Sequence, residues 1–294
     1  MPRYFIHAGA HRTGSSSFQM CLYLNRDALK AAGFDVAYPG RDGAPQGTLD
    51  MRFPSPRHGD GPHPGFTQKT RRIISQHSSG PDGSMILSEE NIPGRMLHFQ
   101  KGQFFPKCET RLRVLKDALK GPVARLVYVL RDYANLYASA YRKRAEDTAV
   151  DPWDGAVTKF MGMDRGWPEI VEMLRDILQP EAFEVVPYTA RGSSRDLLYR
   201  LAPEAGAGWV EPERTVNLSP SDAALEEIQA QFAAGKEPTP QDLARIVAAH
   251  RDTPRSGFAE FTAEQQAELD ARYNTDLLRI GEMKGVSLAP APPL

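Results

Sequence analysis

The sequence predicts a three-layer α/β/α fold, in which a central parallel sheet is covered by helices on both faces. Short segments of β-branched, aliphatic and aromatic residues recur along the first two thirds of the chain, and segments with helical spacing of apolar residues separate them. Strands that are apolar without alternation are typical of a parallel sheet, because both of its faces are buried. Strands that alternate with helices favour the same arrangement, since parallel neighbours need a crossover connection.

Length and composition agree with a globular protein of this class. The chain has 294 residues and a net charge of −1, so composition gives no general attraction to nucleic acid or to an anionic membrane. Cys21 and Cys108 lack metal-ligand spacing, and we expect free thiols. No segment reaches the roughly 20 apolar residues of a membrane span. We therefore expect a cytoplasmic protein without a transmembrane segment or a nucleic-acid partner; the sequence leaves the oligomeric state open.

Four segments are expected as the strands of the sheet: Arg3–Ala8, Ser84–Ser88, Ala124–Leu130 and Phe183–Tyr188. Three helical faces lie between or beside them. Their members are Phe18, Cys21, Leu22 and Leu29, then Leu112, Leu115 and Leu119, and then Ile170, Leu174, Ile177 and Leu178. The first face ends before Gly33, a residue type common just past a helix end. Ligands of such sheets bind at the carboxyl ends of the strands.

Three further regions complete the expected organisation, which is a single domain over residues 1–285. Residues 39–66 contain six prolines and six glycines, which predicts a long surface loop that is either disordered or an active-site lid. Residues 220–285 have helical patterns and form the helical C-terminal part. Residues 286–294 end in "APAPPL" and are expected to be a flexible tail.

The segment "FIHAGAHRTGSSSFQ", residues 5–19, has the features of an anion-binding turn between a strand and a helix. Backbone N–H groups at such a helix start attract an anion, and its serines add hydroxyl donors. Gly9 and Gly14 have the spacing of a nucleotide phosphate loop, but Ser15 occupies the lysine position and the basic residue is Arg12. An ordinary turn followed by a serine cap would explain the same residues without a ligand.

This loop resembles the 5′-phosphosulfate-binding loop of the sulfotransferases, bacterial members included, that use 3′-phosphoadenosine 5′-phosphosulfate as donor. The matching residues are Arg12, Thr13, Gly14, Ser15 and Ser16, with arginine in place of the commoner lysine. The resemblance implies a P-loop-like sulfotransferase fold. It also implies that the donor's phosphosulfate is held by Arg12, Thr13, Gly14, Ser15, Ser16 and Ser17, with Arg12 stabilising the departing phosphate.

A second phosphate site is expected where "LVYVLRDYANLYASAYRKR" passes from a strand into a helix. Arg131 stands at the strand's carboxyl end, and Ser139 lies almost two helical turns beyond Asp132, on the face that Arg131 can follow. The resembled family has an arginine and a serine at this spacing for the donor's 3′-phosphate, often with a proline where Tyr133 stands. A surface arginine beside an ordinary helix remains the alternative.

Two glutamates follow the strand Ser84–Ser88, and one of them is the expected base. The resemblance assigns this catalytic role to Glu90, with Glu89 as the alternative, while an acidic first helical turn would also explain the pair. His7 on its buried strand is expected to be a core residue, and His11 could touch the phosphosulfate.

Other residues complete the expected site. Tyr188 matches a family tyrosine near the adenine, although a core or edge tyrosine fits its position as well. Asn217 and Ser219 fall in a pattern found late in bacterial members and receive no role. His58 and His63 lie in the proline-rich segment without zinc spacing, so no metal is expected.

The sequence therefore predicts a sulfotransferase that moves a sulfuryl group to a hydroxyl or amine of a carbohydrate, a lipid or a small metabolite. One alternative is a nucleotide kinase or NTPase on the same architecture, which would need Mg²⁺ and a carboxylate such as Asp132. The other is a non-catalytic protein that binds an anion or a lipid on the same fold.

Overall fold

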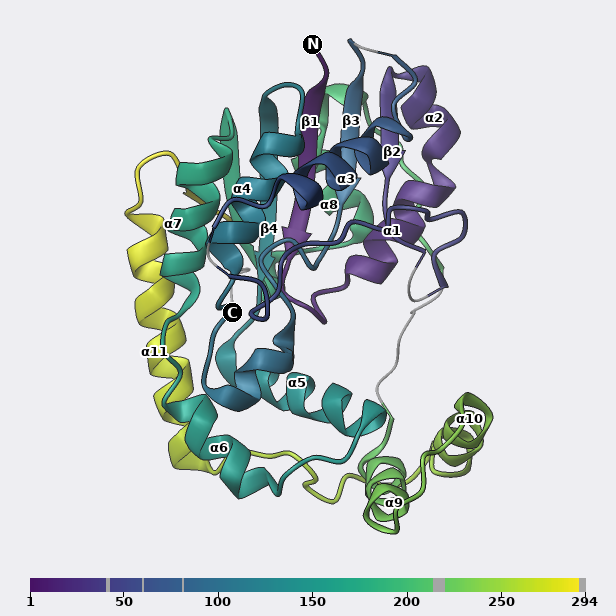
Figure 1. The fold of residues 1–294 in the computed structure, drawn as a ribbon, viewed down its shortest axis with the longest axis vertical. Helices are drawn as coiled ribbons and strands as arrows, with labels where there is room; N and C mark the ends of the chain where they lie inside the picture. Colours follow the sequence, from purple (N-terminus) through teal and green to yellow (C-terminus); the bar gives the residue numbers. More distant parts are fainter. Residues whose placement is uncertain (41–42, 60, 81, 214–219, 291–294) are drawn as a thin grey trace.

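The computed structural model describes residues 1–40, 43–59, 61–80, 82–213 and 220–290. Within them a six-stranded parallel sheet has the order β2-β3-β1-β4-β5-β6, and helices cover both of its faces (Figure 1). The strands are β1 (Arg3–Gly9), β2 (Phe34–Ala37), β3 (Ser84–Ser88), β4 (Val123–Leu130), β5 (Ala182–Pro187) and β6 (Ser287–Leu288). The predicted three-layer α/β/α fold is confirmed.

The helices connect these strands and extend the domain beyond the sheet. The α-helices are α1 (Ser15–Leu24), α2 (Arg26–Ala31), α3 (Pro64–Ser75), α4 (Cys108–Ala118), α5 (Tyr133–Asp147), α6 (Trp153–Met161), α7 (Trp167–Leu178), α8 (Ser194–Leu201), α9 (Asp222–Ala233), α10 (Pro240–Ala249) and α11 (Ala263–Gly281). Three short 3₁₀ segments are η2 (Met96–Lys101), η3 (Tyr188–Ala190) and η4 (Pro203–Ala205). The C-terminal part is helical, as the sequence predicts, and α11 packs on α5 and α7.

The central strand β1 shows why the sequence has no alternation of polar and apolar residues. Tyr4, Ile6 and Ala8 face one core layer, and Phe5 faces the other, where it packs with Phe18 of α1. Successive side chains of a strand point to opposite faces. An apolar residue is therefore needed at nearly every position when helices cover both faces.

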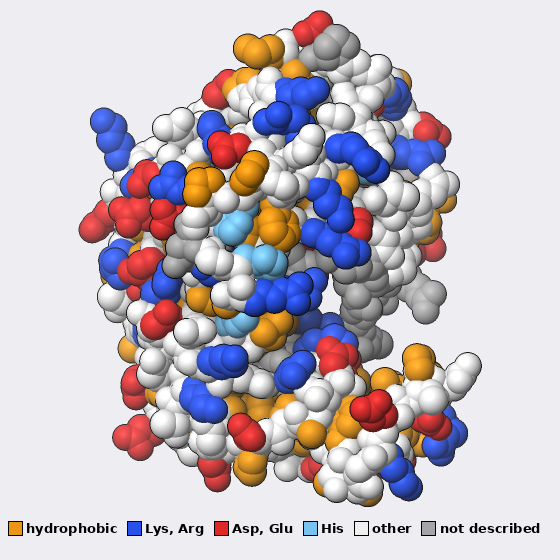
Figure 2. All heavy atoms as spheres, viewed as in Figure 1, with side chains coloured by type: hydrophobic (Ala, Val, Ile, Leu, Met, Phe, Trp, Pro, Cys, Tyr) orange, Lys and Arg blue, Asp and Glu red, His pale blue; other side chains and the backbone are white. Residues whose placement is uncertain are grey.

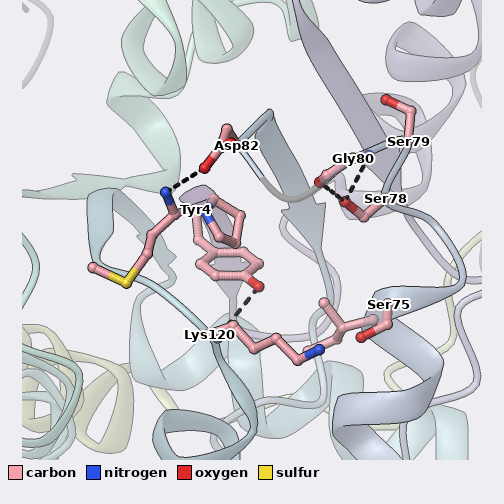
Figure 3. A pocket seen from close by; sticks show the side chains of 10 residues that line it. Tyr4, Ser75, Ser78, Ser79, Gly80, Asp82 and Lys120 are labelled. Carbon is pink, nitrogen blue, oxygen red and sulfur yellow. Dashed lines mark hydrogen bonds and ion pairs between the residues drawn. The ribbon is translucent and has the colours of Figure 1, made fainter.

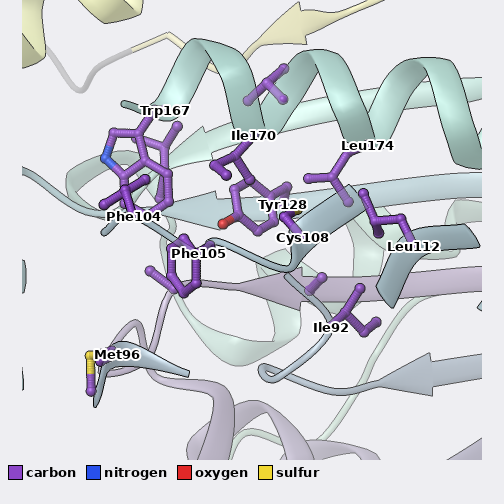
Figure 4. Close-up of a cluster of buried hydrophobic side chains, with 14 of the residues drawn as sticks. Ile92, Met96, Phe104, Phe105, Cys108, Leu112, Tyr128, Trp167, Ile170 and Leu174 are labelled. Atoms are coloured by element: carbon purple, nitrogen blue, oxygen red, sulfur yellow. The ribbon is translucent and has the colours of Figure 1, made fainter. Parts of the chain in front are cut away.

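An aromatic cluster fills the first of these layers beside the carboxyl end of β4 (Figure 4). Trp167 is fully buried at the start of α7, and its ring meets that of Phe104 edge-to-face with centroids 4.8 Å apart. The Trp167 indole N–H donates to the carbonyl of Arg131, at 2.8 Å. The core thus fixes the backbone of a predicted site residue.

The structure differs from the sequence prediction in the segment 39–66. Leu49, Met51 and Phe53 are buried in the main core, so the described part of this segment is neither disordered nor wholly on the surface. The buried guanidinium of Arg111 donates to the carbonyl of Pro54 at 3.0 Å and lies over the Phe53 ring, 4.7 Å from its centroid. Prolines and glycines prevent regular structure here, but three spaced apolar side chains are enough to anchor the chain.

Two smaller predictions also need correction. Residues 286–294 are not all a flexible tail, because Ser287 and Leu288 form β6 against β5 and the N–H of Ala289 donates to the carbonyl of Val185 at 2.9 Å. The first helix is divided at Asn25, whose side chain bonds the carbonyls of Cys21 and Val210. Each feature depends on a hydrogen bond to a residue distant in sequence, Val185 for Ala289 and Val210 for Asn25, so local patterns do not contain them.

Candidate functional site

The turn between β1 and α1 lies at the carboxyl edge of the sheet, at its central strand. The N–H of Ala10 donates to the carbonyl of Val129 at 2.8 Å, and the buried Thr13 hydroxyl donates to the carbonyl of Ala10 at 2.6 Å. Arg12 has a φ of 66° and Gly14 a φ of 81°, both in the left-handed region. Left-handed residues within a short turn make successive N–H groups converge, which is the geometry of an anion-binding concavity.

The first turn of α1 is left open for such an anion. Gly14 is the N-cap residue and contributes no side-chain cap, and no acidic residue lies in the first turn. Ser15 is buried, and its Oγ has no hydrogen-bond partner among the described residues. Helix N-terminal N–H groups carry partial positive charge and need acceptors. This helix end therefore offers donors and a positive potential where the sequence predicts a phosphosulfate.

Two arginines, Arg191 buried and Arg131 half-buried, hold this turn by its carbonyl oxygens. Arg131, which follows β4, donates from Nη1 to the carbonyl of Arg12 at 3.1 Å. Arg191, which follows β5, donates from Nη2 to the carbonyl of Gly14 at 3.1 Å. The Nε atoms of Arg131 and Arg191 are buried without a hydrogen-bond partner in the described structure. Two guanidinium charges thus lie against one short loop and retain donors for a ligand.

Arg191 is a site residue that the sequence prediction missed. Its side chain is 8% exposed and also donates to Ser194 Oγ at 3.2 Å, and burial lowers its pKa, although an arginine remains charged at neutral pH. A Cβ atom added to Gly14 would lie 3.1 Å from the Arg191 Cζ. The signal was available, since Arg191 follows a predicted strand at the ligand edge, as Arg131 does.

Tyr188 and Ser139, the other two residues of the predicted nucleotide site, form no hydrogen bond with Arg131 among the described residues. Tyr188 is 43% exposed, and the guanidinium of Arg131 lies over its ring, 5.5 Å from the centroid. Ser139 lies half-buried on α5, and no hydrogen bond joins it to Arg131 within the described residues. Asn217 and Ser219 lie outside the described residues. The structure thus places Tyr188 beside Arg131, and leaves the pairing of Ser139 with Arg131 as a prediction.

Tyr133, at the position where the resembled family often has proline, has a structural role of its own. Its hydroxyl donates to Asp276 of α11 and accepts the N–H of Trp167 at 2.7 Å. Burial, reinforced by Asp276, raises the pKa of Tyr133 far above its ordinary value, so the phenol stays protonated. This network joins the C-terminal helix to the helix that follows Arg131.

The two glutamates after β3 point in different directions. Glu89 is 1% exposed, and its carboxylate accepts the N–H of Asn91 at 2.8 Å. Glu90 faces the turn between β1 and α1, where its Oε1 lies 3.2 Å from Nδ1 of His11. The geometry favours Glu90 over Glu89 as the carboxylate of the site.

The histidines differ in their surroundings. His7 is fully buried and its Nδ1 is 2.9 Å from Ser88 Oγ; burial, together with the charge of Arg191, lowers its pKa to about 3. His7 is therefore neutral, as expected for a core residue. His58 and His63 pack with the ring of Phe66.

One face of the molecule is rich in basic side chains, although the whole chain is almost neutral. Figure 2 shows Lys, Arg and His side chains across the middle of this face, at about the height where the β1 arrow ends in Figure 1, while acidic side chains gather mostly at the rim. A hollow of about 510 Å³ lies elsewhere, at the opposite edge of the sheet, where Met1, Tyr4, Asp82 and Lys120 line it (Figure 3). It contains none of the predicted site residues.

Comparison with models of protein families gives no match for this sequence, and comparison with curated proteins gives none either. In the described part of the chain, no helix has both the length and the apolar character that a membrane crossing requires. Within the same residues, no three His, Cys, Asp or Glu side chains gather as ligands of a metal ion. The fold and the site together define a three-layer α/β protein in which two arginines hold the turn between β1 and α1 at the carboxyl edge of the sheet.

Proposed function

We propose that the protein is a sulfotransferase that uses 3′-phosphoadenosine 5′-phosphosulfate and transfers its sulfuryl group to a hydroxyl or amine. The observation that carries this proposal is the turn between β1 and α1, which presents helix N-terminal donors and Arg12, and which is held by Arg131 and Arg191. A donor with two separate anionic groups needs several cations at one edge of the sheet. Arginine suits both groups, because its planar guanidinium can bind a phosphate through two parallel bonds.

The chemistry assigned to these residues is an in-line displacement at sulfur. The acceptor's oxygen or nitrogen forms a bond to sulfur while the bond from sulfur to the bridging phosphate oxygen breaks, and that oxygen keeps the electron pair. Glu90 takes the proton of the acceptor, and Arg12 with the N–H groups of the turn stabilises the charge on the departing phosphate. The product is adenosine 3′,5′-bisphosphate. Positioning and electrostatics supply the rate enhancement, as in phosphoryl transfer.

Within this proposal Arg131 has two functions. Its Nη1 holds the carbonyl of Arg12, and its unpaired Nε faces no protein acceptor among the described residues. The 3′-phosphate is the proposed partner of the remaining donors, together with Ser139 on α5, the helix that follows Arg131, and Tyr188 lies beside the adenine in this proposal. The acceptor is a carbohydrate, a lipid or a small metabolite, and a cytoplasmic location remains a prediction from the sequence.

A nucleotide kinase or NTPase on this fold is the second candidate, and two observations weigh against it. Ser15 occupies the position of the phosphate-loop lysine. Asp132, the carboxylate expected for Mg²⁺, is instead the cap of α5, where it accepts the N–H of Asn135 at 2.9 Å. A non-catalytic anion-binding protein would bind the same donor without turnover, and loss of Glu90 would then change nothing.

Calorimetric titration tests the donor site. We expect the wild type to bind adenosine 3′,5′-bisphosphate without metal and more tightly than ADP or ATP with Mg²⁺, and Arg131→Ala to weaken binding by about 2 kcal/mol, as for a lost charged partner. Arg113→Ala is the matched control, because Arg113 is exposed on α4 and pairs only with Glu109 among the described residues. A preference for ATP with Mg²⁺, or equal affinity of Arg131→Ala and wild type, would refute the proposal.

A further inference from the structure

His11 is the neighbour of Arg12 in the anion-binding turn, and both of its ring nitrogens face acceptors. Its Nδ1 lies 3.2 Å from Oε1 of Glu90, and its Nε2 lies 3.3 Å from the carbonyl oxygen of Gly94. A neutral imidazole has one N–H group and one acceptor nitrogen. Since a carbonyl oxygen and a carboxylate oxygen both require a donor, this geometry is satisfied by the doubly protonated imidazolium.

The charges around His11 favour the same form. Burial alone would lower the pKa of His11, but the Glu90 carboxylate, the Gly94 carbonyl and the charge of Glu89 together outweigh it, and the pKa is raised above the ordinary value of 6.5. His7, only four residues earlier, is held neutral by its surroundings. The environment of His11 is therefore specific to this position and not a general property of the sheet edge.

We propose that His11, as an imidazolium, is the positioning residue that fixes the Glu90 carboxylate against the anion-binding turn. The inference rests on the proposed function for the role of Glu90 as base. One side of the imidazolium binds Glu90 and the other binds Gly94, so a residue of the turn holds the segment that follows β3 at two points. The base and the anion site then form one hydrogen-bonded unit, and the loss of one proton from His11 removes the charge that holds them together.

This arrangement has a consequence for donor binding. The protonated His11 adds a positive charge next to Arg12, and its deprotonation leaves Glu90 as a negative charge beside the same turn. An anion at the turn is therefore favoured by protonation of His11 and disfavoured by its loss. Affinity for the donor's product should fall as the pH rises through the raised pKa of His11.

Nitrogen NMR of the imidazole rings tests the pair directly and needs no ligand. In long-range ¹H–¹⁵N spectra of the wild type, the His11 signals are assigned by their absence from His11→Asn or His11→Gln. Their titration midpoint should lie above the ordinary value of 6.5. The midpoint should move down in Glu90→Gln and stay in place in Glu109→Gln, which alters an exposed carboxylate on α4. A His11 that titrates at or below 6.5, or that titrates equally in wild type and Glu90→Gln, would overturn the proposal.

Calorimetry with adenosine 3′,5′-bisphosphate at pH 7 and pH 8.5 then tests the link to the anion site. Wild type should bind more weakly at the higher pH. His11→Asn, which keeps a neutral donor, should bind about tenfold more weakly than wild type at pH 7 and show little further change, because the positive charge beside the turn is absent from this variant at both pH values. Because the pKa of the phosphate group lies near 6, the variant also corrects for titration of the ligand. Absence of binding in the wild type would refute the donor site and leave the pair to be judged by NMR. Equal pH dependence of binding in wild type and in His11→Asn would refute the role of His11 and leave the donor site standing.

Discussion

Replacing Gly14 by alanine tests the close approach between the turn that joins β1 to α1 and Arg191. Gly14 has a φ of 81°, and a Cβ added there would meet the Arg191 guanidinium at 3.1–3.3 Å. Gly33 is a matched control, because its φ is 85° and nothing lies within 4 Å of its added Cβ. Alanine at either position must adopt the left-handed conformation, but only at Gly14 must it also displace a buried cation.

The magnitudes follow from these two contributions. An L-residue in the left-handed region costs about 1–2 kcal/mol, so Gly33→Ala should lower the free energy of unfolding by about 1 kcal/mol. Gly14→Ala bears the same cost and also disturbs the Arg191 bonds to the Gly14 carbonyl at 3.1 Å and to Ser194 Oγ at 3.2 Å. One charged hydrogen bond contributes about 1.5–3 kcal/mol. The expected loss for Gly14→Ala is therefore about 3 kcal/mol.

Urea unfolding monitored by circular dichroism measures both variants, and the double variant Gly14→Ala with Arg191→Met measures the coupling. Methionine can bend away from the new methyl group, so the double variant should lose less free energy than the sum of the two single losses. Binding of adenosine 3′,5′-bisphosphate should weaken in Gly14→Ala and remain as in wild type in Gly33→Ala. Equal destabilisation by the two alanines, together with additive effects of Gly14→Ala and Arg191→Met, would refute the reasoning.

Two more predictions concern the helices that support the site. Gly166→Ala should lower stability by about 2 kcal/mol, as overpacking of a filled site does, because the added Cβ would overlap the Tyr133 hydroxyl and lie 2.6 Å from Asp276 Oδ2; thermal unfolding measures this. Asp222→Asn should cost about 3 kcal/mol at pH 7, since it removes the buried carboxylate that pairs with Arg142. Burial raises the pKa of Asp222, but Arg142 and backbone N–H groups lower it below 3.8 on balance. The contribution of the Asp222 charge to stability is therefore present above the unfolded pKa and is lost as the pH falls through the folded pKa. Urea unfolding should accordingly give a smaller difference in the free energy of unfolding between wild type and Asp222→Asn below pH 3.

Each of these predictions has a control within the chain. Gly155 lies inside α6 with nothing within 4 Å of an added Cβ, so Gly155→Ala should not destabilise the fold. Asp147 forms an exposed pair with Lys143 at 3.3 Å, and Asp147→Asn should change stability by less than about 1 kcal/mol at any pH. If Gly166→Ala matched Gly155→Ala, the Tyr133 hydroxyl would have room to move. A loss for Asp222→Asn that did not change between pH 7 and pH 2 would mean that the charge of Asp222 contributes nothing.

The strands could be predicted from the sequence because both faces of the sheet are buried, so that nearly every strand residue is apolar. All four predicted strands occur, each within one residue of the predicted bounds, for example Val123–Leu130 for the predicted Ala124–Leu130. β2 (Phe34–Ala37) escaped prediction because it is short and contains Asp35. That aspartate is buried and accepts bonds from the N–H and the hydroxyl of Ser79, at 2.7 and 2.8 Å. A buried polar residue that is hydrogen-bonded to a residue distant in sequence cannot be distinguished, from the sequence alone, from a polar residue of a loop.

For the candidate site, the sequence predicts only which residues follow a strand and therefore lie at the carboxyl edge of the sheet. Arg12, Arg131 and Glu90 each follow a predicted strand, and the carboxyl ends of parallel strands lie at one edge. Which side chains meet at that edge depends on the backbone of the turns. Arg191 binds a carbonyl 177 residues away, and His11 binds one 83 residues away. No local pattern specifies either contact.

Tyr133 stands where the resembled family often has a proline, and the structure gives this tyrosine a role that proline could not fill. A proline at the first position of α5 would preset the helix start, but it has no group that could reach α11. The tyrosine hydroxyl instead joins Asp276 to the N–H of Trp167, and the Trp167 indole donates to the carbonyl of Arg131. The chain thus replaces a local constraint on the helix start with a tertiary one, in which the C-terminal helix helps to hold Arg131. Under the proposed function, the helical C-terminal part therefore supports the anion site through this network, although none of its described residues follows a strand at that edge.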